Sequence, residues 1–163
     1  MLSLRSAAIR FQAAAPVSRY TEPVTRARLE ADLQRFFEGH RDDVISAYLF
    51  GSHARDRSHR ESDIDIGVLL NRASAPTPAI RFERRLRLTG DLMAVSRRPA
   101  VDVVILNDAP PQFARSVLVN GRRVFCADDE ADHAFLRTTL LRAADLEPFL
   151  RRTRRVKLAA LAR

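Results

Sequence analysis

The strongest constraint on this chain is a pair of aspartates inside an apolar segment, at a fixed distance from a glycine–serine turn. Asp63 and Asp65 alternate with isoleucines at the start of an apolar run, ten residues after Gly51-Ser52. Such alternation predicts a β-strand, in which side chains two positions apart point to the same face. The two carboxylates would therefore lie about 7 Å apart on one face, at roughly 3.3 Å rise per residue.

Two carboxylates placed this way need a compensating charge. Like charges side by side on a strand repel each other, and aspartate is a poor strand former. A pair of solvated loop acids would not explain the alternation of Asp63 and Asp65 with Ile64 and Ile66. Oxygen-only ligands favour Mg²⁺ or Mn²⁺ over zinc, and Mg²⁺ usually completes its shell with waters and substrate phosphates. The pair therefore predicts both a divalent metal ion and a nucleoside triphosphate.

Asp102 is the candidate third carboxylate. It lies inside the apolar run 101–106, which reads as another strand. A two-metal site needs carboxylates that hold ions about 3.5–4 Å apart, and two acids on one strand plus one from a neighbouring strand would supply them. Taken alone, Asp102 would be read as an edge-strand acid that faces water. Beside Asp63 and Asp65 it is predicted to be a metal ligand.

Gly51 and Ser52 follow a predicted buried strand, 44–50, and open a turn. Glycine allows the backbone to approach a phosphate closely, and a serine hydroxyl with free backbone N–H groups can hold phosphate oxygens. The Gly-Lys-Ser/Thr signature of a Walker P-loop is absent. Arg55 follows within the next turn and is a candidate phosphate contact, with a solvated surface arginine as the alternative.

The predicted elements alternate in a way that favours an α/β (α+β) fold with a mixed sheet and helices packed on it. We expect a helix ending at Gly39, strands 44–50 and 64–70, a helix 79–96, a strand 101–106, a helix 110–119, a short strand 123–126 and a helical tail from about 128 that Pro148 breaks or kinks. One domain over 22–163 accommodates these elements. Residues 1–21 are expected to be a disordered extension or the product of a start codon assigned too early.

Composition restricts the partners of the protein. No apolar run approaches the roughly 20 residues that span a bilayer. The single cysteine, Cys126, excludes a disulfide framework and fits a reducing compartment, so we expect a cytoplasmic protein without membrane association. The net charge of +8 comes from the two ends, because residues 1–21 carry +3 and residues 151–163 carry +6. A nucleic-acid-binding domain would show a basic face across its body, so no direct nucleic-acid binding is expected.

The combination of these motifs resembles that of the nucleotidyltransferase superfamily of polymerase-beta-like fold. In its length, the chain is similar to the minimal nucleotidyltransferases. The matching segments are 51–55, 62–66 and 101–104. The C-terminal part, with Pro110-Pro111, Asn120-Gly121 and a proline-containing helical tail, is similar to the MntA antitoxin adenylyltransferases of type VII (HEPN/MNT) toxin–antitoxin systems. The resemblance covers roughly residues 25–155.

The resemblance implies a definite activity. Such proteins transfer AMP from ATP to a tyrosine of a cognate HEPN-domain RNase toxin and thereby inactivate it. Asp63, Asp65 and Asp102 would hold two Mg²⁺ ions, and Asp102 would be the best candidate to accept the proton of the acceptor hydroxyl. Gly51 and Ser52 would position the triphosphate. Catalysis would depend mostly on alignment and charge neutralisation.

Two other functions remain open at this stage. A small-molecule nucleotidyltransferase, such as one that modifies aminoglycosides, would use the same core but usually carries an additional substrate domain. An antitoxin that blocks its toxin by contact alone would use the basic helix after Pro148. Replacing Asp63 and Asp65 with asparagine separates these functions, because contact inhibition would survive the change. A DNA-binding regulator is less favoured, since no helix-turn-helix pattern stands out.

Overall fold

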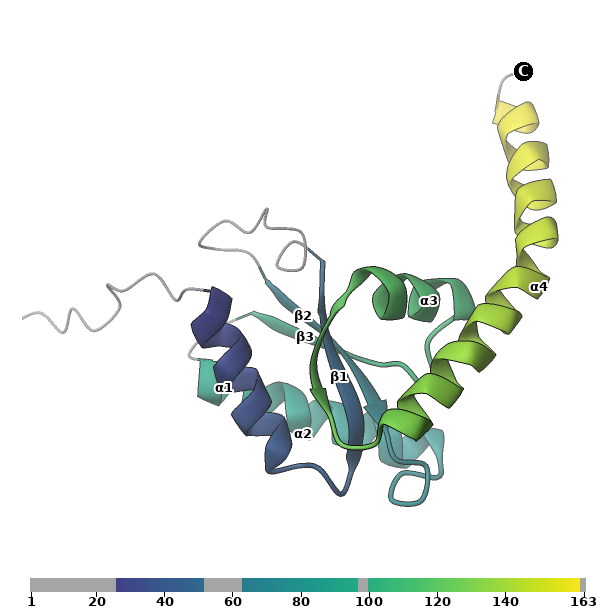
Figure 1. The fold of residues 1–163 in the computed structure, drawn as a ribbon. Helices are drawn as coiled ribbons and strands as arrows, with labels where there is room; N and C mark the ends of the chain where they lie inside the picture. Colours follow the sequence, from purple (N-terminus) through teal and green to yellow (C-terminus); the bar gives the residue numbers. More distant parts are fainter. Residues whose placement is uncertain (1–25, 52–62, 97–99, 162–163) are drawn as a thin grey trace, which may run out of the picture.

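The computed structural model describes residues 26–51, 63–96 and 100–161 and shows a four-stranded sheet with helices on both faces (Figure 1). In chain order the elements are α1 (Arg26–Glu38), β1 (Val44–Phe50), β2 (Ile64–Leu70), α2 (Pro78–Ser96), β3 (Val101–Ile105), α3 (Pro111–Asn120), β4 (Arg122–Cys126) and α4 (Asp129–Leu161). The predicted fold class and element order are confirmed, and the boundaries differ by only one or two residues. The extension 1–21 lies outside the described residues.

The sheet is mixed, with strand order β3-β2-β1-β4. Strand β1 runs antiparallel to both β2 and β4, whereas β2 and β3 are parallel. Parallel neighbours need a crossover connection, and α2 supplies it. The two strands that carry the predicted acidic residues, β2 and β3, are therefore adjacent, with β3 at the edge of the sheet.

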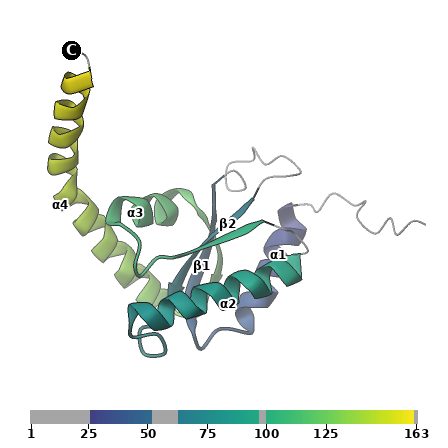
Figure 2. The ribbon, with the colours of Figure 1, turned by 180° about the vertical axis from the view of Figure 1, so that it is seen from behind.

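The larger core lies between the sheet and the helices α1 and α2, which Figure 2 shows together on one side of the sheet. Ile64, Ile66 and Val68 of β2 have no solvent exposure and belong to this core. Burial of one such side chain contributes about 1.5–3 kcal/mol. The predicted alternation in β2 is therefore real, because its even-numbered residues point toward α1 and α2.

A smaller core covers the opposite face of the sheet, where α3 and α4 pack (Figure 1). Tyr48, Leu69 and Val117 are among its buried members. Leu69 shows that the odd-numbered residues of β2 point to this side, and Asp65 follows the same alternation. The acidic residues therefore share a face with α3 and α4, near the end of the sheet where β1 stops.

Helix α4 is 33 residues long and includes Pro148 in its interior. A proline removes one helical hydrogen bond and usually kinks a helix. The expected helical tail is confirmed, but Pro148 does not end it. The helix changes direction along its length, and its C-terminal part extends away from the domain in both views (Figures 1 and 2). None of the helices described combines the length and hydrophobicity needed to span a bilayer.

Candidate active site

Gly51 ends β1 in a conformation that favours glycine. Its φ angle is +71°, in the left-handed region that residues with a β-carbon rarely adopt. A β-carbon at this position would also overlap the carboxylate of Asp65, at Oδ2. Glycine is therefore required twice, once by the backbone and once by the approach of the acidic side chain. The predicted turn after β1 is confirmed, and it lies directly against one of the predicted metal ligands.

Asp65 and Asp102 are brought together by strand register. They are Cα partners in the parallel pair of β2 and β3. Neighbouring strands lie about 4.8 Å apart, and residues in register point to the same face of the sheet. Phe50, the residue before Gly51, is the partner of Asp65 on the other side. One end of the sheet thus gathers Gly51, Asp65 and Asp102 from three adjacent strands.

Asp63 lies immediately before β2, two residues from Asp65. Its side chain is exposed, as is that of Asp102, whereas Asp65 is half-buried. Ser52 and Arg55, the predicted phosphate contacts, lie outside the described residues. Among the residues that the structure describes, no three His, Cys, Asp or Glu side chains converge closely enough to hold a metal ion. The metal ligation of Asp63, Asp65 and Asp102 stays a prediction.

Arg85 is a residue of this region that the sequence did not single out. Its Nη2 atom lies 3.6 Å from Oδ1 of Asp102, and the two side chains are 45% and 58% exposed. An ion pair this exposed contributes about 1 kcal/mol or less. Its significance is positional, since it places a cation from α2 beside an acid of β3. Arg85 lies in a segment rich in arginine, and only the fold brings this one to Asp102.

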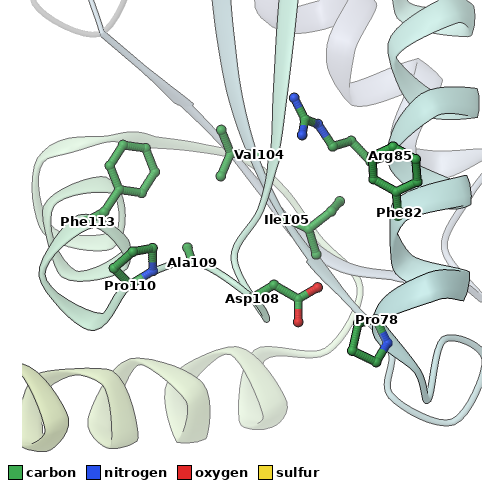
Figure 3. A pocket seen from close by; sticks show the side chains of 9 residues that line it. All are labelled: Pro78, Phe82, Arg85, Val104, Ile105, Asp108, Ala109, Pro110 and Phe113. Atoms are coloured by element: carbon green, nitrogen blue, oxygen red, sulfur yellow. The ribbon is translucent and has the colours of Figure 1, made fainter.

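A groove of about 690 Å³ opens beside this ion pair, between α2, β3 and the start of α3 (Figure 3). It is lined by Pro78, Phe82, Arg85, Val104, Ile105, Asp108, Ala109, Pro110 and Phe113. The volume falls in the range of small-molecule sites, and the lining is mostly apolar. Arg81 fixes one wall by donating two hydrogen bonds to the Asp108 carboxylate, at 2.8 and 2.6 Å.

A comparison with models of protein families decides to which family this chain belongs. Residues 31–130, more than half of the 163-residue chain, match the family model described as polymerase beta, nucleotidyltransferase. The chain belongs to this nucleotidyltransferase family. The matched range includes all the predicted catalytic acids and the groove beside them. No curated protein matches this nucleotidyltransferase in sequence.

Solved structures share the fold of this nucleotidyltransferase. One is a toxin–antitoxin complex with AMP-PNP, with a TM-score of 0.60 and 23% identity over 82% of this chain and 98% of that chain. Another is the MntA–HepT toxin–antitoxin complex, with a TM-score of 0.55 and 21% identity over 83% and 97% of the two chains. A third is a tri-AMPylated Shewanella oneidensis HEPN toxin with its MNT antitoxin, with a TM-score of 0.57 and 20% identity over 85% and 100%. At these identities the likeness shows a shared fold.

A buried carboxylate, Asp132, holds α4 of this nucleotidyltransferase on the sheet. The residue is 1% exposed and accepts hydrogen bonds from the Ser46 hydroxyl at 2.6 Å and the Tyr48 hydroxyl at 2.7 Å. Arg123 donates a third bond at 3.1 Å. Burial, followed by the hydrogen bond to Asp132, raises the pKa of the Tyr48 phenol. The sequence showed Asp132 only as one acid of an acidic first helical turn, which is a common surface feature.

Proposed function

We propose that this chain is an antitoxin that acts as a protein adenylyltransferase, transferring AMP from ATP to a tyrosine of a cognate HEPN-domain RNase toxin. The observation that carries the proposal is the juxtaposition of Asp65 and Asp102 beside Gly51 at one end of the sheet. Family membership supports nucleotidyl transfer. The solved complexes that share the fold, one with AMP-PNP and one with an AMPylated HEPN toxin, favour ATP and a toxin as the two substrates.

The residues present fit a metal–nucleotide substrate. Asp63, Asp65 and Asp102 offer only carboxylate oxygens, the ligands that Mg²⁺ prefers. Because Gly51 has no β-carbon, the Asp65 carboxylate can lie directly against the turn that ends β1. In the proposal the three aspartates hold two Mg²⁺ ions, while Gly51, Ser52 and Arg55 contact the triphosphate. When bound, the ions would neutralise the charge on the phosphates and on the departing pyrophosphate.

The transfer itself needs a proton acceptor near the incoming hydroxyl. The acceptor oxygen forms a bond to the α-phosphorus of ATP, the bond between the α-phosphorus and its bridging oxygen to the β-phosphate breaks, and pyrophosphate leaves. The hydroxyl proton passes to the carboxylate of Asp102, which is accessible at the edge strand. Arg85, 3.6 Å from that carboxylate, places a positive charge beside it. The remaining contribution of the protein is alignment.

A small-molecule nucleotidyltransferase is the second candidate. The observation that favours it is the groove of about 690 Å³ beside Arg85, because its size suits a small acceptor. Its apolar lining argues against a polycationic sugar, which would need several acidic groups. A groove of this kind would equally admit an aromatic side chain of a protein acceptor. The identity of the acceptor therefore separates the two candidates.

The test is intact mass spectrometry of a candidate HEPN-domain toxin, sought among the products of neighbouring genes, after incubation with the chain, ATP and Mg²⁺. The proposal expects a mass gain of one or more AMP units on the toxin. Asp63→Asn and Asp65→Asn variants should abolish the gain, and Asp91→Asn, an exposed acid on α2, should preserve it. A toxin that is silenced by the chain without any mass gain would establish contact inhibition instead.

A further inference from the structure

The C-terminal part of α4 is an unpartnered amphipathic helix. The last contacts that tie α4 to the domain come from Gln112, which donates to the Ala143 carbonyl at 2.7 Å and lies 3.4 Å from the Glu147 carboxylate. Beyond Pro148, none of the side chains that the structure describes is buried. The helix nevertheless continues to Leu161 and extends from the domain (Figures 1 and 2). Most of the described side chains in this part of the helix are exposed and could contact a partner.

Apolar side chains form a stripe along this extension. Leu146, Phe149, Leu150 and Val156 are 39%, 66%, 37% and 63% exposed. Positions 146, 149, 153 and 156 are separated by three, four and three residues, which places them on one face of a helix. The face includes Thr153 between the larger residues. A stripe with anchors at this spacing is typical of a helix that lies in an apolar groove of another protein.

The rest of the extension is basic. Residues 151–161 include five cations, Arg151, Arg152, Arg154, Arg155 and Lys157, and no acid. Arg151 forms an ion pair with Glu147 at 2.8 Å. Among the described residues, Arg152, Arg154 and Arg155 form no ion pair within 4 Å, although the pKa of Glu147 is lowered by the Arg151 hydrogen bond and further by the charge of Arg154. Arginine pairs with carboxylates through two parallel hydrogen bonds, so this surface is complementary to clustered acidic side chains.

We propose that the segment 146–158 of α4 docks into an acidic-rimmed apolar groove on the protein that accepts AMP. The identity of that protein as a HEPN toxin rests on the proposed function. A second copy of this chain does not fit, because pairing two such helices would bring five positive charges against five. A nucleic-acid backbone would pair with the arginines but offers no apolar groove for Phe149 and Val156. Docking on α4 would hold the partner on the side of the sheet to which Asp65 and Asp102 point, and would raise the effective concentration of its acceptor hydroxyl.

The test measures binding by calorimetry between the full-length chain and the same candidate HEPN-domain toxin. The stripe variant Phe149→Glu/Val156→Glu should bind at least about 30-fold more weakly, in line with the loss of interface anchors. The charge variant Arg152→Glu/Arg155→Glu should also weaken binding and remove most of its dependence on salt. The matched control is Leu86→Glu/Val95→Glu on α2, where the two side chains are 57% and 51% exposed. It should bind within about two-fold of wild type.

The outcomes separate this inference from the proposed function. Asp63→Asn should bind the toxin like wild type while it fails to transfer AMP. If the wild-type chain binds the toxin, the stripe variant does not, and the wild-type chain transfers no AMP, the docking surface is supported and the proposed function is overturned. If the wild-type chain transfers AMP and the stripe and charge variants bind the toxin as tightly as wild type, only the docking surface is overturned. The docking surface would also be overturned if the wild-type chain bound no toxin. The same holds if the stripe and charge variants lost binding only to an RNA oligonucleotide or to anionic phosphatidylserine vesicles and kept their binding to the toxin.

Discussion

Asp65 and Asp102 lie opposite each other across the parallel strands β2 and β3. The pairing places both carboxylates on one face at the end of the sheet, although a helix separates them in sequence. Asp102 is the more accessible of the two, at the edge strand, where an acceptor can approach. This difference in access assigns the proton-accepting role to Asp102 in the proposed reaction.

Asp102→Asn should lower the rate of AMP transfer by about 10²–10⁴-fold, the usual contribution of a positioned base. The fold should be unaffected, because the side chain is 58% exposed and surface changes usually alter stability by less than about 0.5 kcal/mol. Single-turnover transfer kinetics and thermal unfolding check both parts. Asp91→Asn is the matched control. A rate for Asp102→Asn within a few-fold of wild type would remove Asp102 from the catalytic set.

Gly51→Ala should damage the site more than it damages the fold. The left-handed backbone costs about 1–2 kcal/mol for a residue with a β-carbon, and the methyl group would displace the Asp65 carboxylate. We expect AMP transfer to fall at least about 100-fold, as when a catalytic group is misplaced by about 1 Å. Gly90→Ala is the control, because a β-carbon there meets no atom within 4 Å. In the interior of α2 it should stabilise the protein by about 0.5–1 kcal/mol. Urea unfolding and the transfer assay compare the two variants, and equal activities would contradict the prediction.

Asp132→Ala should destabilise the protein by about 3 kcal/mol, because it leaves the buried hydroxyls of Ser46 and Tyr48 without their acceptor. Tyr48→Phe removes one donor to the same carboxylate and should cost about 1 kcal/mol. Urea unfolding of the two single variants and the double variant measures their coupling. His133→Ala, at the exposed neighbouring position, should leave stability unchanged. Additive costs for Asp132→Ala and Tyr48→Phe would show that the two groups act independently.

Cys126 should be a slow nucleophile in the folded protein. Burial, with a smaller contribution from the Asp132 carboxylate, raises the pKa of its thiol from 9.0 to about 11. The thiolate is the reactive form, so alkylation by iodoacetamide at pH 8 should be about 100-fold slower than for an ordinary thiol. The rate should rise as the pH approaches 11, and urea-unfolded protein should react at the ordinary rate. Since the folded-state pKa is the higher one, this thiol contributes stability that is complete below pH 9 and lost as the pH rises toward 11. A pH–rate profile with its midpoint near 9 in the folded protein would contradict the assignment.

The strands, helices and turns that could be predicted from the sequence are those that depend on the pattern of neighbouring residues. Alternation in 64–70 predicted both a strand and its two faces, and the structure confirms this through the complete burial of Ile64 and Ile66. The glycine after β1 predicted a turn, and Gly51 adopts the left-handed conformation that such turns use. The sequence predicts a break or a kink at Pro148, and α4 continues through this residue while changing direction along its length (Figure 1). A proline weakens a helix locally, but the turns on either side can still form.

The tertiary structure alone decided which residues meet. Strand order and register place Asp102 beside Asp65, and the packing of α2 on β3 brings Arg85 to Asp102. The burial of Asp132 depends on where α4 meets β1, which no periodicity in the helix encodes. The sequence by itself determined the type and extent of each element and the presence of the acidic motif, because these follow from side-chain periodicity and backbone preference. The assembled site depends on contacts between distant segments, whose free energies are set by the complete packing of the domain.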